Sequence, residues 1–85
     1  MPEITVYSRR ICSFCNAAKQ LLQNRGYEYH EVNLDEHPEL MADIMRRSGQ
    51  RTVPQIFVGE KSVGGFTELR ASILSGEFEQ LTGSS

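Results

Sequence analysis

Residues 4–15 read ITVYSRRICSFC, a stretch that joins an alternating segment to two cysteines spaced two residues apart. The β-branched residues from Ile4 to Val6, followed by Tyr7, are typical of a strand. From Ser13 to Arg25 apolar side chains recur at helical spacing, and Gly26 is a suitable C-terminal cap. A strand that runs through a short connection into such a helix places the Cys-x-x-Cys pair at the turn, where thiol–disulfide redox motifs belong.

The rest of the chain yields further elements by the same reasoning. In chain order we predict a strand over 27–34, a helix over 35–47 with Asp35 as N-cap, and a hairpin of strands 55–58 and 61–63 around Gly59-Glu60. A helix over 66–74 follows, then an exposed tail over 77–80 and fraying over 82–85. The order β-α-β-α-β-β-α predicts an α/β, thioredoxin-like fold, in which three helices flank one four-stranded mixed sheet.

Length and composition narrow the class of protein. The 85 residues predict a single domain over 1–85, and the net charge of -2 gives no reason to expect nucleic acid as a partner. No apolar run approaches the ~20 residues that span a bilayer, and the N-terminus lacks a secretion signal, so we expect a cytoplasmic protein that does not bind membranes. A structural zinc site would need His30 and His37, whose spacing is unsuitable, so we predict no such metal site.

Cys12 and Cys15 occupy distinct positions in the first turn of the expected helix. Residues three apart on a helix have Cβ atoms ~5–6 Å apart, which is close enough for a disulfide after a small adjustment. Unpaired N–H groups, the helix dipole and the preceding Arg9 and Arg10 all favour a thiolate at Cys12, and the thiolate is the attacking species. We therefore expect Cys12 to be the nucleophile and Cys15 the resolving thiol, rather than both being inert buried residues.

Two further segments carry weaker signals. Pro54 stands at the entrance to a strand, where a cis bond after Val53 would free the Val53 backbone to pair with an extended peptide, although a trans proline on an edge strand explains the sequence as well. Gly64-Gly65 precedes a helix whose first N–H groups can hold a carboxylate. A helix capped by Thr67 accounts for that segment equally well.

Together these segments resemble the glutaredoxins, specifically the small bacterial dithiol type. The motifs that carry the resemblance occur in order over nearly the whole chain: Tyr7-Ser8, Cys12 to Cys15, residues 46–49, residues 52–58 and Gly64-Gly65. The resemblance implies a cis Pro54 and glutathione as electron donor. It also implies a glutathione-binding set, namely Arg9, Phe14, Thr52, Val53, Pro54, Gly65, Phe66 and Thr67.

The same resemblance implies an activity. A monomer would reduce protein disulfides and glutathionylated proteins through Cys12 and Cys15, and two glutathione molecules would then reduce the enzyme. Family potentials of about -200 to -230 mV suit exchange with cytosolic glutathione. A redoxin that depends on thioredoxin reductase is a competing interpretation, which the Gly64-Gly65 loop disfavours.

Three positions depart from the family pattern. Ser13 and Phe14 replace the usual proline and tyrosine between the cysteines, and Thr67 stands where the family usually has aspartate, which predicts weaker glutathione binding. Some family members with serine at the position of Ser13 assemble a [2Fe-2S] cluster between two protomers, using the first cysteine of each and two glutathiones. A cluster-binding dimer with Cys12 as the metal ligand is therefore the alternative function.

Overall fold

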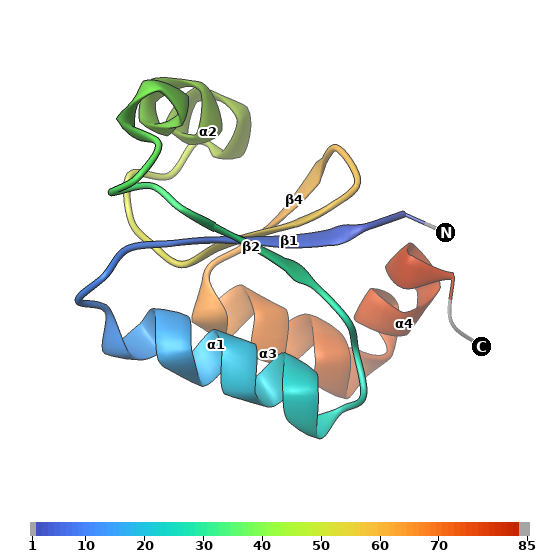
Figure 1. Ribbon diagram of the computed structural model, residues 1–85. Coiled ribbons are helices and arrows are strands. Elements are labelled where there is room, and N and C mark those ends of the chain that lie inside the picture. Colours follow the sequence, from blue (N-terminus) through green and yellow to red (C-terminus); the bar gives the residue numbers. More distant parts are fainter. Residues whose placement is uncertain (1, 84–85) are drawn as a thin grey trace.

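A four-stranded mixed sheet forms the centre of the computed structural model, which describes residues 2–83 (Figure 1). Its strands are β1 (Ile4–Ser8), β2 (His30–Asn33), β3 (Gln55–Val58) and β4 (Lys61–Gly64), in the spatial order β2-β1-β3-β4. β1 pairs in parallel with β2 and antiparallel with β3, and β3 and β4 form an antiparallel hairpin. The sheet topology confirms the thioredoxin-like prediction.

Helices cover both faces of this sheet. In chain order they are α1 (Ser13–Asn24), the short 3-10 helix η1 (Pro38–Leu40), α2 (Met41–Ser48), α3 (Phe66–Ser75) and α4 (Glu77–Thr82). Figure 1 shows α1 and α3 on one face and α2 on the other. The largest buried cluster belongs to the α1 and α3 face, where alternate residues of β1 and β3 meet apolar residues of the helices: Ile4, Val6, Ala18, Leu22, Ile56, Val58, Leu69 and Phe78.

The second strand is shorter than the predicted 27–34. Pairing with β1 begins only at His30, opposite Thr5. The backbone N–H of Tyr27 instead donates to the Leu22 carbonyl at the end of α1, 3.0 Å away. The Tyr29 hydroxyl accepts a hydrogen bond from Gln23 at 3.1 Å. Tyr27 and Tyr29 therefore form hydrogen bonds with the C-terminal part of α1 and do not extend the pairing of β2 with β1.

The predicted helix over 35–47 is wrong at its start. Residues 34–36 form a turn, Pro38 opens η1, and α2 begins only at Met41. Asp35 is not an N-cap, because its carboxylate accepts hydrogen bonds from Arg9 and Arg10 instead. The predicted end of this helix is confirmed, since Gly49 stops it in a left-handed conformation with φ of 72°.

Residues 2–83 contain four α-helices, one more than the predicted three, because residues 77–80, expected to be an exposed tail, belong to a helix. Gly76 ends α3 at a φ of 87°, and α4 follows at once. Phe78 of α4 is fully buried, and its ring packs edge-on against Tyr27 with centroids 5.0 Å apart. The fraying predicted from Thr82 is wrong at that residue, because Thr82 ends α4 and is buried, whereas Ser84-Ser85 lie outside the described residues.

Candidate active site

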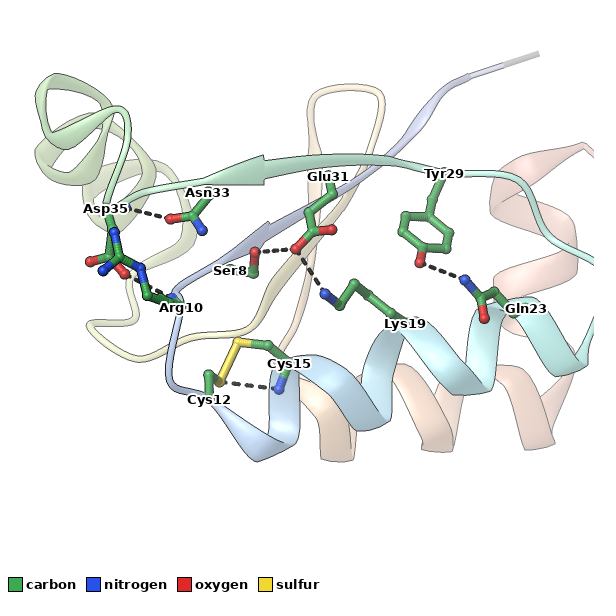
Figure 2. Close-up of polar contacts among 10 residues, drawn as sticks. All are labelled: Ser8, Arg10, Cys12, Cys15, Lys19, Gln23, Tyr29, Glu31, Asn33 and Asp35. Atoms are coloured by element: carbon green, nitrogen blue, oxygen red, sulfur yellow. Dashed lines mark hydrogen bonds and ion pairs between the residues drawn. A yellow bond between two sulfur atoms is a disulfide. The ribbon is translucent and has the colours of Figure 1, made fainter.

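Cys12 is the N-cap of α1, in an extended conformation with φ of -160°. Its sulfur accepts the backbone N–H of Cys15 at 3.1 Å, and the two cysteines form a disulfide with Cα atoms 5.2 Å apart (Figure 2). Cys15 is buried at 1% exposure, whereas Cys12 is only partly buried. The predicted positions of the two cysteines at the start of α1 are thus confirmed, and only Cys12 is open to a bulky partner.

The segment before β3 forms a wall beside Cys12. The Val53–Pro54 peptide bond is cis, as predicted. The Cys12 sulfur lies 3.8 Å from the Val53 carbonyl oxygen, which is a contact rather than a hydrogen bond because a disulfide sulfur has no proton to donate. The side chain of Gln55 holds the wall from behind, since its amide donates to the carbonyls of Gln50 and Thr52 at 3.0 Å each.

A groove of about 430 Å³ lies between this wall and the N-terminus of α3, and we call it the α3-side groove. The rings of Phe14 and Phe66 lie 5.9 Å apart along it. Gly65, not Thr67, is the N-cap of α3, and its N–H donates to the Glu68 carboxylate at 2.7 Å. The first-turn N–H groups of Phe66 and Thr67 have no intrahelical acceptor, so they are available to an anion in the groove.

Gly64, which precedes this cap, is required to be glycine. Its φ is 121°, and an added Cβ would lie 2.8 Å from the side chain of Glu68. L-residues with a side chain rarely adopt this φ, and the clash would displace the carboxylate that caps α3. Gly64 therefore supports the turn that leads into Gly65, which lines the α3-side groove.

A larger groove of about 810 Å³ opens on the other side of the wall, and we call it the α2-side groove. Thr52 and Val53 line both grooves, whereas Cys12 lines only this one. Arg9 also lies here, with its Nε 2.9 Å from Asp35. The backbone N–H of Arg10 and then the Arg9 guanidinium hold the pKa of Asp35 below its usual value.

A polar cluster joins the sheet to α1 beside the disulfide (Figure 2). The hydroxyl of the buried Ser8 donates to Glu31 at 2.7 Å, and Lys19 donates to the same carboxylate oxygen at 2.9 Å. These hydrogen bonds, the one from Lys19 first, lower the pKa of Glu31. Lys19 stands one helical turn after Cys15, so the cluster fixes α1 against β1 and β2 just beyond the redox pair.

The structure brings most of the predicted site residues together. Seven of them line the α3-side groove: Phe14, Thr52, Val53, Pro54, Gly65, Phe66 and Thr67. Arg9 lies on the other side of the wall, in the α2-side groove, where Thr52 and Val53 also line the surface. Sequence reasoning missed Gln50 and Glu68, which also line the α3-side groove, and it misassigned Asp35. Glu68 could have been found as the third residue of a helix that begins after a glycine cap, where glutamate commonly reaches back to the cap N–H.

Residues 2–83 contain neither a candidate membrane span nor a candidate metal cluster. None of the helices in this part of the chain is long and apolar enough to cross a membrane. The same residues contain no group of three or more His, Cys, Asp and Glu side chains placed to hold a metal ion.

A thioredoxin-like sheet with a Cys-x-x-Cys disulfide at the start of α1 defines the class of thiol–disulfide oxidoreductases. The chain belongs to the glutaredoxin family, whose model, described as Glutaredoxin, matches residues 4–63. It is 42% identical over 81 residues to a glutaredoxin of Pseudomonas aeruginosa, which covers 95% of this chain and 96% of the relative. It is 32% identical over 81 residues to glutaredoxin 3 of Escherichia coli, and this match covers 95% of the chain and 98% of the relative.

A solved structure supports the same fold. The chain is similar to the crystal structure of a buckwheat glutaredoxin–glutathione complex, with a TM-score of 0.86 and 27% identity. The match covers 96% of this chain and 77% of the buckwheat chain.

Proposed function

We propose that this thiol–disulfide oxidoreductase uses glutathione as electron donor and reduces protein disulfides and glutathionylated proteins. The observation that carries the proposal is the α3-side groove, because it combines unpaired N–H groups with an exposed backbone wall next to the redox pair. The similarity to a glutaredoxin crystallised with glutathione supports it. In this role the chain acts as a cytoplasmic, single-domain monomer.

Glutathione would lie extended across the wall. Its cysteine backbone would pair with Val53, and its γ-glutamyl carboxylate would meet the N–H groups of Phe66 and Thr67. The opposite carboxylate, at the glycyl end, would reach Arg9 and Thr52. The Glu68 carboxylate lines the α3-side groove, so it would supply the negative partner for the glutathione amino group that the neutral Thr67 hydroxyl lacks.

The reaction follows from the different exposure of the two cysteines. The Cys12 thiolate attacks one sulfur of a substrate disulfide, forms a mixed disulfide and releases the other sulfur as a thiolate, which takes up a proton. Cys15 then loses its proton and attacks the Cys12 sulfur, which releases the second substrate thiol and leaves the enzyme disulfide. Two electrons have passed to the substrate.

Glutathione restores the dithiol in two exchanges. A first glutathione thiolate attacks the Cys12 sulfur, so that Cys12 carries glutathione and Cys15 leaves as a thiolate. A second glutathione thiolate attacks the bound glutathione sulfur, which releases glutathione disulfide and the Cys12 thiolate. On a glutathionylated protein Cys12 attacks the glutathione sulfur directly, so this route does not need Cys15.

The test compares Cys12→Ser with Cys15→Ser in a glutathione-coupled reduction assay. Cys12→Ser should be inactive on every substrate, because a serine hydroxyl stays protonated near neutral pH and does not attack a disulfide. Cys15→Ser should keep activity on glutathionylated substrates and lose much of its activity on protein disulfides. An active Cys12→Ser would overturn the roles, and efficient reduction by thioredoxin reductase but not by glutathione would overturn the donor.

A cluster-binding dimer is the second candidate. The partial exposure of Cys12, beside the exposed Ile11, Ser13 and Phe14, favours it, because the thiolates of two copies must approach one iron pair. Anaerobic reconstitution with iron, sulfide and glutathione separates the two functions. A coloured dimer that Cys12→Ser fails to form would support the cluster, and a colourless monomer would remove it.

A further inference from the structure

The α2-side groove combines charge with apolar surface in a way that glutathione binding leaves unexplained. Arg9, Arg10 and Arg51 line it together with one carboxylate, that of Asp35. Asp35 is paired with Arg9, and neither Arg10 nor Arg51 makes an ion pair within residues 2–83. The groove is therefore locally positive in a chain whose net charge is -2.

The α2-side groove also has an apolar part next to Cys12. Ile11, the residue directly before Cys12, is 95% exposed, and the half-buried Met41 and Met45 line the same groove. A large aliphatic side chain left in water gains free energy when a partner covers it. Methionine side chains adapt to apolar groups of different shape. The groove can thus hold an apolar side chain next to the nucleophile.

The size of the groove indicates what occupies it. At about 810 Å³ it is nearly twice the α3-side groove, and only Arg9 and Thr52 at its edge are needed for the glycyl end of glutathione. Ile11, Met41, Met45, Arg10 and Arg51 remain for a second ligand. Because Cys12 lines this groove, the ligand must lie beside the sulfur that undergoes exchange.

We propose that the α2-side groove docks the segment of a protein substrate that flanks its reactive cysteine, and that it selects an apolar residue next to that cysteine together with nearby acidic residues. The inference rests on the proposed reduction of glutathionylated proteins. In that exchange the Cys12 thiolate attacks the glutathione sulfur, a Cys12–glutathione disulfide forms, and the substrate cysteine leaves as a thiolate that takes up a proton. The flanking segment then leaves with its thiol.

The experiment uses three synthetic glutathionylated peptides, in which the cysteine is flanked by leucine and two glutamates, by leucine and two lysines, or by glycine and two glutamates. Each is made with the two sides of the cysteine in either order. We expect kcat/KM to be about tenfold higher for the first than for the second at low ionic strength, and the ratio to fall as salt screens the charges. We expect kcat/KM for the peptide with leucine and glutamates to be about three times that for the peptide with glycine and glutamates, because Ile11 and the two methionines cover the leucine.

Two variants test the residues themselves. Arg51→Gln should reduce the tenfold preference for glutamates to about threefold, since removing one of two equal cations removes half of the free-energy difference. Ile11→Ser should abolish the preference for leucine over glycine. Arg70→Gln and Leu74→Ser are the matched controls, because both residues are exposed on α3 and line neither groove. They should leave both preferences unchanged.

The outcomes separate the two proposals. Equal kcat/KM for the three peptides, or preferences that persist in both Arg51→Gln and Ile11→Ser, would refute the docking of a flanking segment while leaving the glutathione-dependent activity intact. A wild-type protein that reduces none of the peptides, and no small glutathione mixed disulfide, would refute the proposed function and the docking with it.

Discussion

Gln55 offers a sharp test of how the wall between the two grooves is held. Its side chain is fully buried, and its amide nitrogen donates to the carbonyls of Gln50 and Thr52 at 3.0 Å each. Its amide oxygen has no partner within residues 2–83. The two carbonyl acceptors identify which end of the amide carries the nitrogen. Two substitutions of similar size, Gln55→Met and Gln55→Glu, change this arrangement in different ways.

Gln55→Met should destabilise the protein only slightly. It loses two hydrogen bonds worth about 1 kcal/mol each, but it also removes a buried acceptor whose missing partner costs about 1–3 kcal/mol. The exposed Thr52 and the partly exposed Gln50 allow water to reach the carbonyls that lose their donor. We therefore expect the free energy of unfolding to fall by no more than about 1 kcal/mol, which corresponds to a loss of about 4–8 °C in Tm.

Gln55→Glu should be much more damaging near neutral pH. A carboxylate has no proton to donate, so it would face two carbonyl oxygens in a buried position and without a counter-ion. We expect a loss of about 3 kcal/mol or more, partly recovered as the pH falls, because a protonated glutamate can donate one hydrogen bond. Urea unfolding of wild type, Gln55→Met and Gln55→Glu at neutral and mildly acidic pH measures the difference.

The same variants should report on function. In Gln55→Glu the carboxylate repels the Thr52 carbonyl, so KM for glutathione should rise more than kcat falls. Gln55→Met loses the same hydrogen bonds without adding a charge, so it should raise KM less. Equal destabilisation by the two substitutions at neutral pH would refute the reasoning. So would a loss of stability in Gln55→Glu that is independent of pH.

Three more outcomes follow from other contacts. Phe78→Ala should cost about 3–5 kcal/mol, a large part of the stability of a chain this short, and calorimetry should show a strongly lowered Tm. The pKa of Glu31 is lowered in the folded state from the ordinary value of 4.5, so its stabilising effect is present above that value and lost as the pH falls further. Tm of Glu31→Gln, measured from neutral to acidic pH, should therefore decline less steeply below about pH 4.5 than Tm of wild type. Glu68→Gln should raise the Kd for glutathione several-fold in calorimetric titration while Glu77→Gln, at the start of α4, leaves it unchanged.

The sequence predicted the parts of the fold that depend on local patterns. The strand–turn–helix over residues 4–24, the hairpin and the helix stops at Gly49 and Gly76 all follow from side-chain alternation, helical spacing or glycine conformation. The resemblance to a known family added the cis bond at Pro54, which the residues alone left open.

The errors share one physical cause, a tertiary contact that overrides a local preference. Asp35 has the side chain of an N-cap, but Arg9 and Arg10 reach it from a segment distant in sequence. Residues 77–80 are mostly polar and read as a tail, but Phe78 finds a place in the core against Tyr27. Positions of this kind cannot be assigned from spacing, because the partner lies on another element.

The wall at Thr52 and Val53 also bears on how this protein can diversify. Beyond the wall, the α3-side groove draws on Phe14, Gln50 and residues 65–68, and the α2-side groove draws on residues 9–12, Asp35, Met41, Met45 and Arg51, so the two share little but the wall itself. Substitutions that retune the choice of client protein need not disturb the recognition of the reductant. Exchanging Met41, Met45 and Arg51 between relatives is therefore a modular way to give one redox scaffold a new set of clients.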